Sequence, residues 1–410
     1  MYKYGLKLWS TNKQYITEAI KLYEENVYKY IELFVVPNSF NKFISKWKNL
    51  KIPYVIHAPH FYCGLNLAKH ENLNTNIKLA RETFKFANEL QASKIIFHPG
   101  VDGDIKETVR QLKILNDHRI LIENKPYYAL VKQDGKHLIC NGHSPQDIKL
   151  IIQKTNVGFC LDIGHAIYSA NAKNINSLDY LKQFIKLDPK MFHLTDGNIE
   201  GILDQHKHIK KGSFNFKEIF KLIPEKSFIS IETEKSFKNK LCDFKNDIAT
   251  LKKITEIKLS IKLAQKCDCR DILKLTNDPI VRQNSLNTAI VTLKNHTEWF
   301  NKKINDKDHV FFVIRNKEKN LVGQVRFEQT SKKQYTISIS IAPKFRSKGL
   351  AYILIKKTSN KIITKHKKSI INAFIRKNNI SSIKSFLKAG YKILNKEKKE
   401  FGNVFKLKYD

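Results

Sequence analysis

The sequence feature that most restricts the fold of this chain is a regular alternation between short apolar segments and longer amphipathic segments. Eight apolar segments, rich in β-branched and aromatic residues, recur over the first 256 residues, and helical patterns separate them. One helical pattern opens with Ser144-Pro145, a good cap followed by a good first-turn residue. Eight strands alternating with helices over about 250 residues form the repeat of a TIM (β/α)₈ barrel. We predict the strands at residues 4–9, 30–35, 54–58, 94–98, 120–124, 157–162, 191–194 and 228–232.

The pattern changes after residue 256, where strands begin to follow one another directly. We therefore predict two domains, residues 1–256 and residues 257–410, the second with a mixed α+β fold. A domain of about 150 residues is a common size. We expect its strands at 257–263, 310–315, 323–327, 335–341 and 369–375, its helices at 269–276, 294–305, from 349 onward and at 382–389, and a final hairpin.

Charge and cysteine content restrict the partners only weakly. Lys and Arg number 74 against 38 Asp and Glu, a formal net charge of +36. This excess could attract polyanions such as nucleic acid, or it could reflect lysines spread along helices by AT-rich codon usage. The chain has six cysteines, few for its length, no apolar h-region at its start and no membrane-length apolar run. We therefore expect a cytoplasmic protein with reduced thiols and no membrane partner.

Side chains that can bind metal stand at the ends of most of the predicted barrel strands. The carboxyl ends of barrel strands converge on one mouth, so these residues should meet there. Carboxylates packed together repel one another and shift each other's pKa values, and a divalent cation relieves that repulsion. Imidazole with carboxylate favours zinc, with manganese or iron as alternatives. The nine candidate ligands are His57, His98, Glu123, Asp162, His165, His193, Asp204, His206 and Glu232.

With these residues, the first domain resembles the xylose isomerase-like TIM barrels. This superfamily includes endonuclease IV (the family 2 AP endonucleases) and many sugar-phosphate isomerases and epimerases. All nine candidates match the ligands that hold three zinc ions in endonuclease IV, where the residue matching Glu123 bridges two ions. The resemblance to the sugar isomerases implies one metal, bound by residues matching Glu123, Asp162, His193 and Glu232. In those enzymes the two glutamates serve as catalytic acid and base.

Several residues separate these two branches. Endonuclease IV opens with Gly-Ala-His-Val-Ser, whereas residues 5–9 here read Gly-Leu-Lys-Leu-Trp. Endonuclease IV also has a glycine-rich stretch after the glutamate that matches Glu123, whereas residues 124–127 here read Asn-Lys-Pro-Tyr. No loop rich in both Arg and aromatic residues is evident. Glu32 has no ligand counterpart in endonuclease IV and is either a sugar-hydroxyl contact or a solvated position. Lys125 is either a group that binds phosphate or carboxylate, or an ordinary surface lysine.

The second domain carries a possible anion-binding loop. A predicted strand ends at Ile341, a basic, glycine-containing segment follows, and a helix then begins near Gly349. Backbone N–H groups at a helix N-terminus bind anions, and glycine permits their close approach. This segment resembles the pyrophosphate loop of the GNAT acetyltransferases, which implies acetyl-CoA as cofactor. The resemblance places cofactor contacts at Ile341, Arg346, Ser347, Lys348, Gly349, Leu350, Ala351 and Asn379. Phe386 stands where the family often has the tyrosine that protonates the leaving thiolate.

The start of the second domain resembles GNAT enzymes that acetylate nucleotide-linked deoxyamino sugars. Asn284, Asn287 and His296 are either acceptor contacts or, for the asparagines, caps and turns. Glu328 is a candidate base. We therefore expect a bifunctional enzyme, with a metal-dependent barrel acting on a sugar or sugar phosphate and a GNAT domain that acetylates an amino sugar. The alternatives are a zinc-dependent AP endonuclease-like phosphodiesterase that acts on DNA, and a chain in which one domain only binds ligand.

Overall fold

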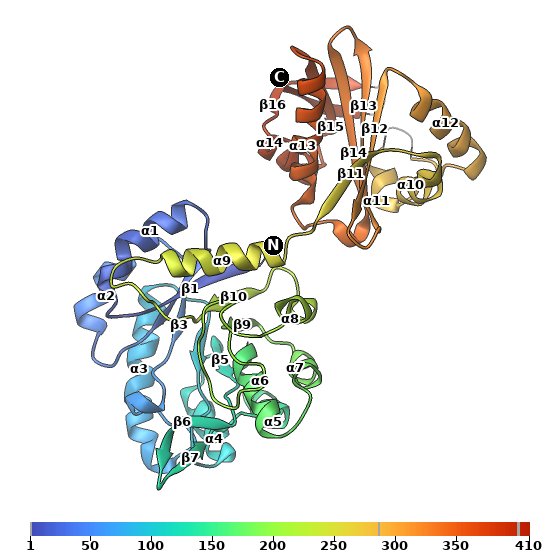
Figure 1. The fold of residues 1–410 in the computed structure, drawn as a ribbon. Coiled ribbons are helices and arrows are strands. Elements are labelled where there is room, and N and C mark those ends of the chain that lie inside the picture. Colours follow the sequence, from blue (N-terminus) through green and yellow to red (C-terminus); the bar gives the residue numbers. More distant parts are fainter. Residues whose placement is uncertain (1, 286–287, 400–401) are drawn as a thin grey trace. The chain divides into compact units, whose positions relative to one another are not determined.

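The structure is a computed structural model that describes residues 2–285, 288–399 and 402–410. The chain divides into two compact units, Met1–Glu256 and Ile257–Asp410, and each is described by itself (Figure 1). In the described part of the chain, no helix combines the length and the apolar character needed to cross a membrane.

The first unit is a closed barrel of eight parallel strands, which confirms the predicted TIM barrel. Each strand pairs with its neighbour around the ring, and the closing pair joins the first strand to the last. The helices surround the strands in Figure 1. The strands are β1 (Lys3–Trp9), β2 (Tyr30–Phe34), β3 (Tyr54–His57), β4 (Ile95–Phe97), β5 (Ile120–Glu123), β8 (Gly158–Asp162), β9 (Met191–Leu194) and β10 (Phe228–Ile231). The helices are α1 (Ile16–Glu24), α2 (Phe40–Lys48), α3 (Leu73–Glu89), α4 (Ile105–Leu115), α5 (Pro145–Lys154), α6 (Ile163–Ala172), α7 (Ser177–Ile185), α8 (Phe216–Leu222) and α9 (Cys242–Ile254).

One layer of buried side chains fills the inside of the barrel and supports the mouth. Successive side chains of a strand alternate between the two faces, so a residue two positions beyond an interior residue also points inward. Gly5 belongs to this layer because a Cβ there would lie 2.3 Å from the ring of Tyr30. The buried cluster is formed by Tyr30, Val55, Ile96, Leu121, Cys160 and Met191. Two positions further along their strands stand Glu32, His57, His98, Glu123, Asp162 and His193.

A two-stranded hairpin follows β5 and was not predicted. It consists of β6 (Tyr128–Gln133) and β7 (Lys136–Ile139), which pair antiparallel. Asp134 and Gly135 make the turn with φ values of 49° and 77°. Positive φ at both central residues is the geometry of a two-residue hairpin turn, for which Asp-Gly is a preferred sequence. The Asp-Gly pair was therefore the available signal for this hairpin.

The second unit is a seven-stranded sheet with helices, and its mixed α+β fold agrees with the prediction. The strand order is β11-β12-β13-β14-β15-β17-β16. The strands are β11 (Leu259–Leu263), β12 (His309–Asn316), β13 (Leu321–Ser331), β14 (Gln334–Ile341), β15 (Ile370–Arg376), β16 (Lys392–Lys399) and β17 (Gly402–Tyr409). The helices are α10 (Cys269–Thr276), α11 (Pro279–Gln283), α12 (Leu293–Asn305), α13 (Leu350–Lys365) and α14 (Ile380–Lys388).

Strands β14 and β15 are parallel and pair only at their beginnings. The pairing joins Gln334, Tyr335 and Thr336 to residues 370–372 and extends no further. The remainder of β14, up to Ile341, therefore lies beyond the ladder with β15. The gap opens toward the glycine-containing segment between β14 and α13, so backbone groups of the sheet become available there for a ligand.

The buried carboxylate of Asp196 organises the long loop after β9. Its Oδ1 accepts hydrogen bonds from the backbone N–H groups of Gly197 and Phe214, and its Oδ2 from those of Lys210 and Gly212. The distances lie between 2.8 and 3.1 Å. Gly212 is required at its position because a Cβ would lie 2.3 Å from the carbonyl oxygen of Gly197. One carboxylate thus fixes the loop that carries two of the predicted metal ligands.

We expect Asp196→Ala to destabilise the barrel by about 3 kcal/mol, because two buried and two partly buried N–H groups lose their acceptor. Urea unfolding of the metal-free protein measures this change. Glu200→Ala is the matched control, since Glu200 is an exposed side chain of the same loop. Equal stability of the two variants would contradict the role given to Asp196.

Candidate functional site

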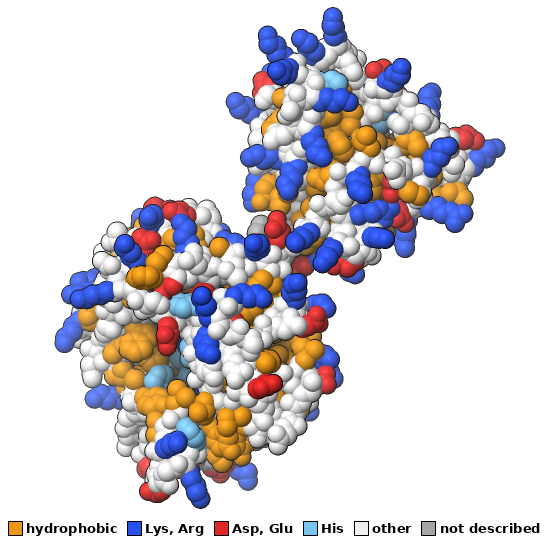
Figure 2. Space-filling model, in the orientation of Figure 1, with side chains coloured by type: hydrophobic (Ala, Val, Ile, Leu, Met, Phe, Trp, Pro, Cys, Tyr) orange, Lys and Arg blue, Asp and Glu red, His pale blue; other side chains and the backbone are white. Residues whose placement is uncertain are grey.

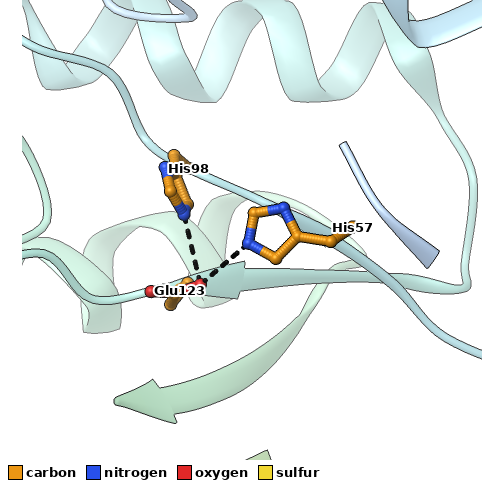
Figure 3. A group of neighbouring side chains, drawn as sticks. All are labelled: His57, His98 and Glu123. Atoms are coloured by element: carbon orange, nitrogen blue, oxygen red, sulfur yellow. Dashed lines mark hydrogen bonds and ion pairs between the residues drawn. The ribbon is translucent and has the colours of Figure 1, made fainter. Parts of the chain in front are cut away.

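Three of the predicted ligands meet where β3, β4 and β5 end. The Nε2 atom of His57 lies 3.3 Å from Oε2 of Glu123, and Nε2 of His98 lies 3.2 Å from the same oxygen. Figure 3 shows both imidazole rings directed at the carboxylate at the end of β5. The Nδ1 atom of His57 lies 2.7 Å from the carbonyl oxygen of Ala58, which leaves Nε2 as the nitrogen available to a metal.

A second group forms around the other side of Glu123 and in the loop after β9. His165 Nε2 lies 3.1 Å from Oδ2 of Asp204, and His206 Nε2 lies 2.7 Å from the same oxygen. His165 Nδ1 lies 3.1 Å from Oε1 of Glu123. Glu123 therefore stands between the two groups and presents one carboxylate oxygen to each.

The remaining predicted ligands lie between these groups. His193 Nδ1 is 2.7 Å from Oε1 of Glu232 and 3.2 Å from Oε2 of Glu123. Asp162 joins His193 and Glu232 in a further set whose ligand atoms all lie within 4.8 Å of one another. The structure thus brings all nine predicted residues together at one end of the barrel, as expected from their positions at strand ends.

These donor atoms fit a divalent cation. The Nδ1 atom of His193 is buried and lies 2.7 Å from Oε1 of Glu232 and 3.2 Å from Oε2 of Glu123, so one nitrogen and two carboxylate oxygens converge on one small volume. A divalent cation there would bind all three atoms and relieve the repulsion between the two carboxylates. Imidazole with carboxylate is a donor set that suits zinc and also manganese. The metal and its identity remain a prediction.

Two further charged residues belong to this site: Lys7, for which no role was predicted, and Glu32, for which two alternatives were open. Lys7 Nζ lies 3.3 Å from Oε1 of Glu32 and 2.5 Å from Oε1 of Glu232. Glu32 is fully buried, so the solvated alternative for this residue is wrong. Its Oε2 lies 3.0 Å from Nε2 of His193 and also accepts a hydrogen bond from the hydroxyl of Ser230. Glu32 thus orients His193 so that Nδ1 faces the centre.

A pocket of about 580 Å³ opens above the clustered ligands. Lys125 lines it, with Nζ 3.6 Å from Oε1 of Glu123, and is therefore not an ordinary surface lysine. His60 and Lys235 also line the pocket, and no sequence pattern had indicated them. Figure 2 shows apolar side chains gathered around a hollow of this unit in which histidines are visible.

In the second unit, the predicted pyrophosphate loop connects β14 to α13. Ser347 and Gly349 have φ values of 61° and 69°, and Gly349 is the N-cap residue immediately before α13. The first N–H groups of a helix have no partner within the helix and point at the space before it. The Arg346 guanidinium contacts Oδ1 of Asp278 at 2.5 Å and donates to the carbonyl of Ile341 at 2.9 Å. The loop therefore has the form of an anion-binding turn.

The other predicted residues of this unit have mainly structural contacts. Asn379 is the N-cap residue of α14, and its Oδ1 accepts a hydrogen bond from Ser382 N at 3.1 Å. Phe386 is buried against Tyr391, whose hydroxyl lies 2.8 Å from that of Ser359. Neither ring offers an acid at the surface, so the family's usual proton donor has no replacement at these two positions.

The acceptor candidates differ in exposure. Asn284 is exposed and donates from its side chain to the carbonyl of Ile280 at 2.8 Å, a helix-ending contact. His296 is buried, and its Nε2 has no hydrogen bond in the part of the chain that the structure describes. Glu328 is exposed and pairs with Lys303 at 2.8 Å. Asn287 lies outside the described residues.

Carboxylates around the metal-free centre raise the pKa values of three histidines. Burial opposes the charge on His193, but its charged neighbours, among them Glu232 and Glu123, outweigh it and raise its pKa well above the ordinary 6.5. Burial opposes the charge on His165, but Asp162 and Asp204 outweigh it and raise its pKa to about 10. Burial likewise opposes the charge on His206, and Asp204 outweighs it and raises the pKa to about 9. Both values exceed the ordinary 6.5, so these interactions stabilise the metal-free fold below pH 6.5. That stabilisation is lost as the pH rises through about 9 to 10.

We expect zinc binding to metal-free protein at pH 7.5 to release about three protons, because ligation needs neutral His165, His193 and His206. The apparent affinity should therefore rise with pH until about pH 10. Calorimetric titration in buffers of different ionisation enthalpy measures the number released. His206→Ala should lower that number by about one, whereas His118→Ala, outside the site, should leave it unchanged. Zinc binding without proton release would contradict the assignment.

Comparison with known proteins gives similar relatives for part of the chain. An uncharacterised protein of Methanocaldococcus jannaschii is 24% identical over 224 residues, which cover 50% of this chain and 80% of that protein. A probable endonuclease 4 of Aquifex aeolicus is 27% identical over 205 residues, which cover 46% and 72%. Among solved structures, spermidine N-acetyltransferase from Vibrio cholerae in complex with CoA and spermine is 21% identical, with a TM-score of 0.35. That match covers 37% of this chain and 94% of the other.

Family models match both units. Residues 25–254 match the xylose isomerase-like TIM barrel family, and residues 258–392 match the acetyltransferase (GNAT) domain. The first match spans more than half of the chain, and the barrel and the mixed sheet are the folds that these matches require. The chain belongs to the xylose isomerase-like TIM barrel family and carries a GNAT acetyltransferase domain after the barrel.

Proposed function

We propose that this chain is a bifunctional sugar-modifying enzyme. Its barrel acts with a divalent metal on a sugar or sugar phosphate, as an isomerase or epimerase. Its GNAT domain transfers acetyl from acetyl-CoA to the amino group of a nucleotide-linked amino sugar. The fusion of a barrel of this family to an acetyltransferase supports this assignment, since both units can then serve one class of substrate.

The position of Glu123 and Glu232 is the observation that carries the barrel assignment. Both carboxylates lie within 3.2 Å of the same atom, His193 Nδ1, but they come from β5 and from the end of β10. A substrate bound at this point would contact both carboxylates, one from β5 and one from the end of β10. One carboxylate could then remove a proton from the substrate while the other returns a proton to it. Lys7 is bound to Glu232 and keeps that carboxylate ionised, as a base requires. A divalent cation bound by these ligands would polarise a substrate oxygen.

A phosphodiesterase of the AP endonuclease type is the second candidate. The arrangement of the ligands favours it, because the possible metal-binding groups are several and Glu123 belongs to two of them, so more than one ion could bind around this glutamate. A relative named probable endonuclease 4 and the net charge of +36 support it as well. The different sequence at residues 5–9 argues against it, because the ammonium group of Lys7 in this segment already forms an ion pair with Glu232.

The two candidates differ in substrate and in metal content. We expect metal-loaded protein to interconvert sugar phosphates, followed by NMR, and to leave abasic duplex DNA intact at low salt. Glu123→Gln and Glu232→Gln should each lower turnover by about 10²- to 10⁴-fold, because each removes a proton-transfer group. Glu71→Gln, an exposed glutamate outside the site, is the control. Three tightly bound zinc ions together with cleavage of abasic DNA would replace the sugar proposal by the second candidate.

For the GNAT domain, we expect acetyl-CoA to raise the midpoint of thermal unfolding of the second unit. The effect should disappear in Gly349→Trp, because this residue has a positive φ where the helix begins and the side chain would occupy the loop. Gly135→Trp is the matched control, a glycine with positive φ and open space in the β6–β7 turn. Lys348→Glu, which leaves the backbone unchanged, should weaken acetyl-CoA binding about tenfold. Failure of acetyl-CoA to protect the parent protein would refute the assignment.

A further inference from the structure

A row of aromatic rings leads from the metal ligands to the rim of the barrel pocket. The ring of Phe34 lies 5.4 Å from that of the ligand His57, 5.1 Å from that of His60 and 5.7 Å from that of Trp9. His60 in turn lies 5.3 Å from Tyr62. We call the five pocket-lining residues Trp9, Phe34, His60, Phe61 and Tyr62 the aromatic wall.

The outer end of the aromatic wall is exposed. Trp9 and Tyr62 are each 54% exposed, and so is Leu130, which lines the same pocket from the β6–β7 hairpin. Single exposed apolar residues are ordinary, but several around one hollow mark a binding surface. A sugar phosphate is polar almost throughout and leaves most of such a surface uncovered. The wall therefore fits a ligand that also carries a flat ring.

Amino groups in the same pocket supply positive charge. Lys235 donates to the carbonyl oxygen of Thr233 and has no ion pair with a carboxylate in the described part of the chain. Burial lowers the pKa of Lys235 to about 8, so an anion placed beside it would stabilise the charged form. Lys125 adds a second amino group, next to Glu123. Both can contact a phosphate group.

The size of the pocket agrees with a ligand of several parts. Its volume of about 580 Å³ lies inside the range of about 300–1,000 Å³ found for drug-sized ligands. The carboxylates and imidazoles lie at its base and the exposed rings at its rim. A ligand that contacts both must extend from a hydroxyl-rich end to a flat apolar end.

We propose that the barrel binds its sugar as a nucleotide-linked sugar. The base stacks on the aromatic wall at Trp9 and Tyr62, the phosphates contact Lys235 and Lys125, and the sugar reaches Glu123 and Glu232. This inference rests on the proposed sugar function and specifies its substrate class. It makes the two units act on substrates of one kind.

The test is calorimetric binding to the full-length, metal-loaded chain with saturating coenzyme A, which occupies the nucleotide site of the GNAT domain. UDP-N-acetylglucosamine and GDP-mannose are compared with N-acetylglucosamine 1-phosphate and mannose 1-phosphate. We expect each nucleotide-linked sugar to bind at least about tenfold tighter than its 1-phosphate, since stacking on an aromatic ring tolerates any base. Trp9→Ala and Tyr62→Ala should each reduce this difference about tenfold and leave 1-phosphate binding unchanged.

Two controls locate the effect in the barrel pocket. Ile114→Ala removes a comparably exposed apolar side chain outside the pocket and should change nothing. Lys235→Met should weaken both nucleotide-linked sugars and 1-phosphates. Equal affinity for the two classes, or a difference that survives Trp9→Ala and Tyr62→Ala, overturns the inference. In that case, metal-dependent binding of the 1-phosphates still supports the sugar function. Tight binding to abasic DNA that Trp9→Ala abolishes would overturn both.

Discussion

The barrel mouth depends on charge neutralisation among buried groups. Carboxylates from four strands and from one loop meet there, and burying any of them alone would cost several kcal/mol. Each has a histidine or lysine within ion-pair distance, as Glu123 has in four imidazoles and Asp204 in two. The rigid barrel below holds these groups in place, because the interior layer is apolar and closely filled. Because these side chains lie close together, several of their nitrogen and oxygen atoms surround the same small volumes, where one divalent cation could bind them together.

Parts of this arrangement follow directly from the sequence, and parts do not. The eight strands and the meeting of the nine candidate ligands at one mouth were predictable because parallel strands in a barrel share one functional end. The place of Lys7 was not predicted and that of Glu32 was left open, although both lie two residues beyond an interior position, because one charged residue on a strand is usually solvated. The aromatic wall is assembled from the ends of three strands, so no local pattern contains it. The Asp-Gly turn of the β6–β7 hairpin was a readable signal that the prediction did not use.

In the second unit, the predicted pyrophosphate loop lies where strands β14 and β15 separate. The loop after Ile341 can approach a phosphate only if the strand before it is free of its neighbour, and β14 leaves β15 after three residue pairs. Arg346 is engaged with Asp278 and a backbone carbonyl, so its contribution is to shape the turn. The local sequence gives less information about the site that binds the acetyl acceptor. Of its described candidates, Asn284 follows α11, His296 lies in α12 and Glu328 lies in β13, and the side chains of Asn284 and Glu328 contact other protein groups.

The ammonium group of Lys7 gives the barrel centre a positive charge on a flexible stem. It now rests between Glu32 and Glu232, whose oxygens lie on two different strand ends. A cation bound at Glu232 would compete with this amine for the same carboxylate. Because Lys7 also lines the pocket, this one side chain stands between the ligand cluster and the space that a substrate would enter, and a change at either would be felt through its charge.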